Sequence, residues 1–352
     1  MKSFAILLLL FTTAFSQTDE RKLLSLFYTR NYEALISETA EILKNNSEDP
    51  VANSFRGQTL VKLGRFGEAK RFLETALENQ KNNLAARAYI MLNLGWIYYI
   101  EKETNKAAGI LYSCSKLEVK AGAPRDAKRS LVLLGLDSLY HKWKLFETND
   151  IIFHFPPDSK VSDKEAFARS RQIAYEKISN FFNADLKRKI NFYAWNKSTD
   201  AENIGLRPLG FSEPEFFITH SAINQTRGHE IAHIVIRNYV KTETVNKFID
   251  EGAAMYFDMT GRNRLQAARD IIKEMGYKSK ISISGIWQKP ADYPDLIIYY
   301  LGAALVERLV NEESKEKLTQ LLKFQSYENA ENIYGERLNT VIGNLENELS
   351  AQ

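Results

Sequence analysis

The segment GHEIAH at residues 228–233 places His229 and His233 four positions apart, with Glu230 directly after the first histidine. On an α-helix, residues four apart lie on the same face, so both imidazoles can reach one metal ion. The chain has only five histidines among 352 residues, which makes this arrangement uncommon by chance. The segment therefore predicts a helix that carries two metal ligands. The alternative is a helix with two unrelated histidines.

A third ligand is expected because catalytic zinc sites commonly use three protein ligands and leave one position for water. Glu251 begins the small-residue run EGAAMYF and follows His233 after seventeen intervening residues, which suits two antiparallel helices. Asp250 is the competing candidate. Both acids could instead be ordinary charges at a helix N-terminus, where the helix dipole favours them. Read together with the histidine pair, the pattern predicts one zinc ion per chain on His229, His233 and Glu251.

Residues 20–145 have apolar side chains at helical spacing, with short breaks between the periodic segments. Residues 60–83 and 92–117 repeat one pattern at an offset of 38 residues. The same offset separates Gly57 and Gly95, which let paired helices approach closely. These copies resemble tetratricopeptide repeats, although that family commonly uses 34 residues. The resemblance implies an α-solenoid with a concave face. That face would bind a protein partner, or the repeats would serve as a structural spacer.

The pattern changes near residue 145, where strand-like segments begin. Residues 149–159 and 188–196 read as strands, and a third short strand is expected within 215–221. Residues 163–184 have helical periodicity, which returns at about residue 225 and continues to the C-terminus. A few strands followed by helices indicate an α+β domain that is mostly helical.

The segments HEIAH and FIDEGAAMYF together resemble the gluzincin metallopeptidases, and more narrowly the bacterial peptidase MA-like domains. The resemblance covers roughly residues 150–310 and implies a zincin-like domain. It implies that His229, His233 and Glu251 bind zinc and that Glu230 is the general base acting on the zinc-bound water. It also implies that the strand EFFITHS at 215–221 is an edge strand able to pair with an extended peptide substrate.

The segment IYYLGAALVERLV at residues 298–310 resembles the gluzincin helix that carries a catalytic tyrosine. Tyr299 fits that frame best and Tyr300 is second. The resemblance implies that one of them donates a hydrogen bond to the oxyanion formed during peptide hydrolysis. The alternative for both is an aromatic pair packed in the core.

Other polar residues are weaker candidates. His220 ends the third predicted strand and is a candidate for substrate contact, while Asp258 is a candidate for orienting a ligand histidine. His141 and His154 are read as structural. Cys114 is the only cysteine of the chain and is read as a small buried hydrophobe.

The N-terminus has the features of a secretory signal peptide. Lys2 precedes an apolar run over residues 4–15 that is too short to span a bilayer, and Ser16 and Gln17 precede a charged stretch. Cleavage is expected near these two residues, which places the protein in the periplasm or outside the cell. A buried N-terminal helix and an uncleaved anchor are the alternatives. No later apolar run reaches the length of a transmembrane helix.

The net charge of +3, from 47 basic and 44 acidic residues, gives no basis for nucleic-acid binding. We therefore expect a signal peptide at 1–17, tetratricopeptide-like helical repeats at 18–145 and a gluzincin-like metallopeptidase domain at 146–352. The expected function is that of an exported zinc-dependent metallopeptidase acting on a peptide or protein. The alternative is a non-catalytic binding or scaffold protein with a metallopeptidase-like domain.

Overall fold

The computed structural model describes residues 20–206, 210–277 and 281–350. The predicted signal peptide lies outside the described residues. Contacts divide the chain into two compact units, Met1–His141 and Lys142–Gln352. This division lies four residues before the border predicted between residues 145 and 146.

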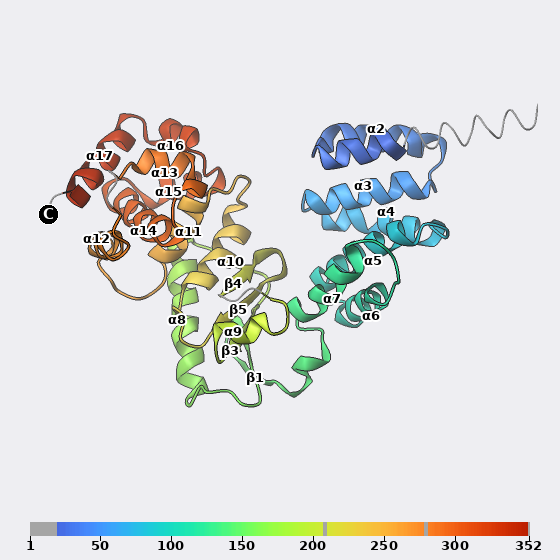
Figure 1. The fold of residues 1–352 in the computed structure, drawn as a ribbon, viewed down its shortest axis with the longest axis horizontal. Helices are drawn as coiled ribbons and strands as arrows, with labels where there is room; N and C mark the ends of the chain where they lie inside the picture. The colour runs from blue at the N-terminus through green and yellow to red at the C-terminus, as the bar shows by residue number, and fades with distance from the viewer. Residues whose placement is uncertain (1–19, 207–209, 278–280, 351–352) are drawn as a thin grey trace, which may run out of the picture. The chain divides into compact units, whose positions relative to one another are not determined.

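The described part of the first unit is helical (Figure 1). Successive helices pack against one another along the chain. Residues 20–28 are helical, and the helices that follow are α2 (Tyr32–Asn45), α3 (Pro50–Lys62), α4 (Phe66–Asn79), α5 (Leu84–Ile100), α6 (Thr104–Ser115) and α7 (Ala123–Leu133).

The same close contact recurs in two helix pairs of this unit. A Cβ atom added to Gly57 on α3 would lie 2.5 Å from Cγ of Leu73 on α4. A Cβ atom added to Gly95 on α5 would lie 2.5 Å from Cγ of Leu111 on α6. Both leucines are fully buried. Each glycine therefore provides the space into which a leucine of the next helix packs, as the repeated pattern predicts.

The second unit contains a mixed five-stranded sheet in the order β1-β2-β3-β5-β4. The parallel pairs are β2–β3 and β3–β5, while β1 and β4 are antiparallel to their neighbours. The strands are β1 (Lys144–Glu147), β2 (Ile151–Phe155), β3 (Ile190–Trp195), β4 (Phe211–Glu213) and β5 (Ile218–Ala222). The predicted strands at 149–159 and 188–196 correspond to β2 and β3.

The prediction of an edge strand at 215–221 is wrong. Residues Pro214–Phe216 form the short 3-10 helix η2, and the strand that follows, β5, pairs with β3 on one side and β4 on the other. The edge strand on this side of the sheet is β4, which is only three residues long. Such a short strand leaves too little alternation to be read from the sequence.

One face of the sheet carries the core of this unit. Phe153, Phe155 and Phe192 point toward α8 (Lys164–Phe182), where Phe167 packs edge-on against all three rings. Helix α10 (His229–Val240) packs against α8, β4 and β5. The helix with the predicted metal ligands therefore rests on the sheet and on α8.

The C-terminal helices pack around α14 (Asp295–Glu312), which contacts α11, α12, α15 and α17. The C-terminal helices besides α14 are α11 (Lys247–Tyr256), α12 (Arg264–Glu274), α13 (Ile283–Gln288), α15 (Lys315–Lys323), α16 (Tyr327–Tyr334) and α17 (Glu336–Ser350). The remaining short helices are η1 (Ser138–Lys142), α9 (Ser198–Glu202) and η3 (Pro290–Asp292). The expectation of a mostly helical α+β fold is confirmed.

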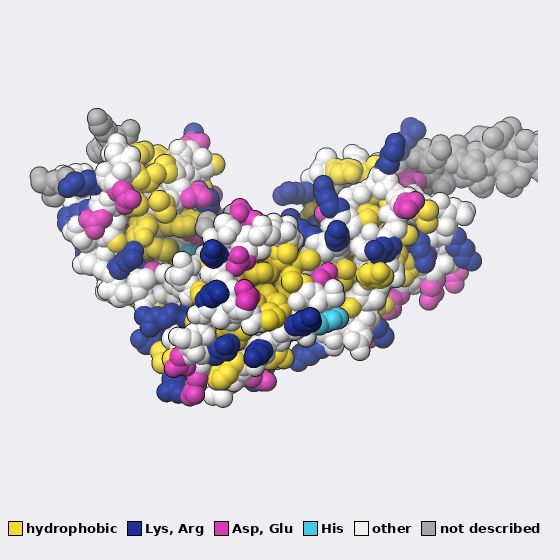
Figure 2. All heavy atoms as spheres, turned by 60° about the horizontal axis from the view of Figure 1, so that its bottom comes forward, with side chains coloured by type: hydrophobic (Ala, Val, Ile, Leu, Met, Phe, Trp, Pro, Cys, Tyr) yellow, Lys and Arg dark blue, Asp and Glu magenta, His cyan; other side chains and the backbone are white. Residues whose placement is uncertain are grey.

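The surface charge is mixed in sign. On the face shown in Figure 2, Lys and Arg side chains are interspersed with Asp and Glu side chains and with apolar groups. None of the helices among the described residues combines the length and apolar composition needed to cross a bilayer.

Candidate metal centre

Helix α10 begins at His229, directly after Gly228. A Cβ atom on Gly228 would lie 2.0 Å from the carbonyl oxygen of Phe257, which directly follows α11. This close approach requires glycine, and it fixes the start of α10 against the end of α11. Glu230 lies in the first turn of the helix, and His233 lies one turn after His229.

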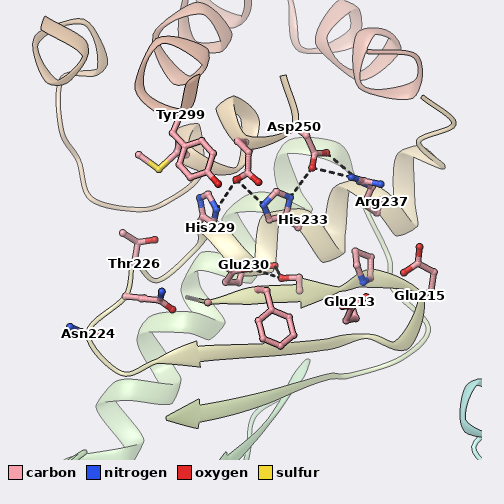
Figure 3. Close-up of a pocket in the computed structure, with 17 residues that line it drawn as sticks. Glu213, Glu215, Asn224, Thr226, His229, Glu230, His233, Arg237, Asp250 and Tyr299 are labelled. Atoms are coloured by element: carbon pink, nitrogen blue, oxygen red, sulfur yellow. Dashed lines mark hydrogen bonds and ion pairs between the residues drawn. The ribbon is translucent and has the colours of Figure 1, made fainter. Parts of the chain in front are cut away.

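Helix α11 brings the acidic pair to the histidines. Its first turn is capped by Asn246, whose side chain accepts a hydrogen bond from the amide of Phe248. Oε2 of Glu251 lies 3.3 Å from Nε2 of His229 and 3.5 Å from Nε2 of His233. Figure 3 shows the two imidazoles turned toward the same point.

The three side chains fit a metal ion. One ligand atom from each of His229, His233 and Glu251 lies within 4.8 Å of the others, so a single cation can contact all three. Two imidazole nitrogens and one carboxylate oxygen are donors that divalent transition metals accept. The structure thus brings together the three predicted ligands.

Asp250 does not join this set but supports it. Its Oδ2 lies 3.3 Å from Nδ1 of His233, the ring nitrogen that faces away from Glu251. Arg237 binds the same carboxylate through Nε and Nη2, at 3.2 and 3.0 Å, and Nε2 of Gln325 lies 3.3 Å from Oδ1. By contrast, Nδ1 of His229 is buried with no hydrogen-bond partner among the described residues.

The charges of this group reinforce one another. Burial opposes ionisation of Glu251, but its hydrogen bonds with the two histidines outweigh burial and lower its pKa to about 2. Burial likewise opposes ionisation of Asp250, and contacts with His233 and Arg237 lower its pKa below the usual range. Burial disfavours protonation of His233, yet its hydrogen bonds with Asp250 and Glu251 raise its pKa well above the ordinary value. These pKa shifts favour the charged forms of both carboxylates and of the His233 ring.

His229, His233 and Glu251, called the metal group below, form one wall of a cavity of about 710 Å³. Glu230 also lines this cavity, and its side chain is largely buried. The hydroxyl of Ser212 on β4 lies 2.8 Å from Oε2 of Glu230. The opposite walls are formed by β4, η2 and the loop before α10. Figure 3 shows Glu213 and Glu215 at one end of the cavity and Asn224 and Thr226 at the other.

The structure separates the two candidate tyrosines on α14. Tyr299 lines the cavity, and its ring centroid lies 6.3 Å from that of His229. Burial raises the pKa of Tyr299, and the nearby carboxylate of Glu251 adds to the shift. Tyr300 instead accepts a hydrogen bond of 3.1 Å from Nη1 of Arg262 and does not line the cavity. Of these two tyrosines, only Tyr299 can therefore contact a molecule bound at the metal group.

Two weaker candidates do not reach the site. Asp258 is fully buried in an ion pair of 2.8 Å with Arg264 and contacts neither histidine of the metal group, so the prediction that it orients a ligand is wrong. His220 pairs with Phe211 of β4 and stacks on its ring, on the sheet face opposite Ser212. It is buried and does not line the cavity, so the predicted substrate contact is not found.

Three residues that contact the site were not predicted from the sequence: Ser212, Arg237 and Gln325. Arg237 follows His233 by four residues, so the helical spacing that paired the histidines could also have identified it. Ser212 lies 18 residues from Glu230, and Gln325 lies 75 residues from Asp250. No local pattern connects residues at such separations.

No protein-family model matches this chain, and no curated protein matches it.

Proposed function

We propose that this protein is a zinc-dependent metallopeptidase of the gluzincin type, in which a zincin-like domain follows an α-solenoid of tetratricopeptide-like repeats. The observation that carries the proposal is the convergence of His229, His233 and Glu251 on one point in the wall of a large cavity. Two histidines and a glutamate form a ligand set that catalytic zinc uses, with a fourth position left open. Glu230 lines the same cavity, and a purely structural metal site has no need of it.

Zinc on these ligands would lower the pKa of a water molecule and polarise a substrate carbonyl. Glu230 is the base that takes the proton of the attacking water and passes it to the leaving amine. Tyr299 donates a hydrogen bond from its hydroxyl to the carbonyl oxygen as negative charge develops there. Asp250 holds the ring of His233 in the orientation that its ligand role requires.

The substrate would be a peptide or protein segment in extended form. β4 is an edge strand in the order of the described sheet, and its three residues Phe211, Ser212 and Glu213 all line the cavity. Main-chain groups of an extended peptide can pair with such an edge. In this proposal the edge strand is β4, and β5 supports it from behind.

The repeat unit would bind a protein partner of the enzyme. Alternatively, it would serve as a structural spacer that holds the catalytic domain. The recurring contacts of Gly57 with Leu73 and of Gly95 with Leu111 support the repeat interpretation, since both pairs have the same spacing along the chain. The apolar run over residues 4–15 supports export. The N-terminal sequence of the mature protein tests export: it should begin near Gln17, and a protein that retains Met1 would contradict it.

Metal analysis and one substitution test the enzymatic proposal. Purified wild-type protein should contain about one zinc per chain. Glu230→Gln should retain the zinc but lose peptidase activity, measured by comparing newly formed termini in a peptide library. Glu274→Gln is the matched control, because Glu274 is exposed on α12 and lies outside the cavity.

Three outcomes separate the candidate functions. A wild-type protein that binds no zinc refutes the proposal at its first step. A Glu230→Gln variant that cleaves as well as the wild type refutes the mechanism. A protein that binds zinc and cleaves no peptide would instead favour the binding or scaffold function.

A further inference from the structure

Ser212 is the middle residue of β4 and lies opposite Thr219 of β5. Alternation along the strand directs its side chain toward α10, while its neighbour Phe211 packs on His220 across the other face. Its hydroxyl lies 2.8 Å from Oε2 of Glu230 and 2.8 Å from the main-chain carbonyl oxygen of the same residue. One serine thus contacts both the side chain and the backbone of Glu230.

The hydroxyl has one hydrogen to share between these two acceptors. The anionic oxygen is the stronger acceptor, because hydrogen bonds to ionised groups are stronger than those between neutral groups. Glu230 needs such a donor, since the residue is only 8% exposed and a buried carboxylate is costly without hydrogen bonds. No other described residue donates a hydrogen bond to its carboxylate.

Gly210 lies beside the second carboxylate oxygen of Glu230. A Cβ atom added there would lie 2.9 Å from Oε1 of Glu230 and 2.2 Å from Oε1 of Gln225. Gln225 is itself fixed, because its Oε1 accepts hydrogen bonds from Ser221 and from the amide of Ala222. Only glycine at position 210 therefore allows the backbone to lie this close to the carboxylate of Glu230. Its Oε1 accepts no hydrogen bond from the described residues.

We propose that Ser212 is a positioning residue for Glu230. Its hydroxyl holds Oε2, and this fixes the carboxylate so that Oε1 is free to exchange a proton with the reacting water. The inference rests on the general-base role of Glu230 in the proposed function. It adds that this base is oriented by the same edge strand that borders the substrate cavity.

Crystal structures of the wild type, Ser212→Ala and Ser212→Thr test the contact, whether or not metal is present. The Glu230 carboxylate should have one position in the wild type and in Ser212→Thr, which keeps the hydroxyl. In Ser212→Ala it should move or occupy several positions. Ser170→Ala is the matched control, because this half-buried serine on α8 also donates its hydroxyl to a carbonyl, at 2.7 Å from Phe167. A carboxylate that stays in place in Ser212→Ala overturns the inference.

Kinetics of the zinc-loaded protein test the consequence. Ser212→Ala should lower kcat about tenfold and leave KM within about twofold, because the base is misplaced while substrate contacts remain. Ser212→Thr should restore kcat, and Ser170→Ala should not change it. A Ser212→Thr variant that loses as much kcat as Ser212→Ala would show that the hydroxyl is not what positions the base and would overturn the inference.

Binding of acetohydroxamate gives a readout that needs no turnover. This probe binds the metal and shares a proton with an adjacent carboxylate. Calorimetry measures its affinity for the zinc-loaded protein. This affinity should be lower in Ser212→Ala than in the wild type. It should be the same in the double variant Glu230→Gln, Ser212→Ala as in Glu230→Gln alone. Unchanged affinity in the first comparison would count against the inference. A wild-type protein that binds the probe but cleaves no peptide would refute the proposed function, while the calorimetric and crystallographic comparisons would still decide whether Ser212 orients Glu230.

Discussion

Oδ2 of Asp250 lies 3.3 Å from Nδ1 of His233. The next residue along the chain, Glu251, lies 3.5 Å from Nε2 of the same ring. Two consecutive acids of α11 thus contact opposite nitrogens of one imidazole, so one can orient the ring while the other shares its metal. Such a supporting carboxylate fixes both the tautomer and the orientation of a ligand histidine.

Replacing the supporting acid should weaken metal binding without removing a ligand. We expect Asp250→Asn to lower zinc affinity about 10- to 100-fold, because the ring of His233 loses the carboxylate that orients it. Competition with a zinc-binding dye measures the affinity. Asp295→Asn is the control, since Asp295 is exposed and pairs with Lys247 outside the metal group. Equal affinity of Asp250→Asn and wild type would show that the contact has no effect on the metal.

Metal binding should release protons, and zinc affinity should rise with pH. The pKa of His233 is raised well above its ordinary value in the metal-free site, because its hydrogen bonds with Asp250 and Glu251 outweigh burial. A coordinating imidazole must lose its proton, so protons compete with the metal and affinity falls as pH falls through the raised pKa. Calorimetry in buffers of different ionisation enthalpy measures the released protons. Zinc binding without proton release near neutral pH would contradict this prediction.

The two tyrosines of α14 should differ in their effect on catalysis. Tyr299→Phe removes the hydroxyl that borders the cavity, and we expect kcat to fall about 10²-fold, the loss typical of an oxyanion donor. Zinc content should not change. Tyr300→Phe should leave kcat unchanged, because the hydroxyl of Tyr300 contacts Arg262 and does not line the cavity. Equal effects of the two substitutions would exclude a specific role for Tyr299.

The contact between α11 and α14 should tolerate no added side chain. A Cβ atom on Gly302 would lie 2.4 Å from the carbonyl oxygen of Phe248 and 2.9 Å from Cα of Gly252. We expect Gly302→Ala to lower the free energy of unfolding by about 1–3 kcal/mol, the usual cost of overpacking. Denaturant titration measures this free energy. The substitution also pushes apart the helices that carry Tyr299 and Glu251, so zinc affinity should fall with it.

Gly343 provides the control for this effect. It lies on α17 with no atom within 4 Å of an added Cβ. Gly343→Ala should therefore stabilise the protein by about 0.5–1 kcal/mol, because alanine is favoured over glycine inside a helix. A Gly302→Ala variant as stable as Gly343→Ala would show that the two helices can separate at little cost.

Features that depend only on neighbours along the chain could be predicted before the structure was known. His229 and His233 share a helix face wherever the segment is helical, because four residues make about one turn. Strands β2 and β3 follow from their β-branched and aromatic residues, and the small residues at Gly57 and Gly95 indicate tight helix pairs. These predictions need only the geometry of one helix or one strand.

The packing of helices and strands settled which residues meet across separate elements. It placed Glu251 at the two imidazoles and Asp250 behind one of them, although these residues are adjacent in sequence. It also directed Tyr299 into the cavity, committed Asp258 to Arg264, and made β4 the edge that holds Ser212 against Glu230. The physical reason is that each contact depends on how two elements pack, and packing is fixed by the whole core of the unit, while the local sequence fixes only the face on which each side chain lies.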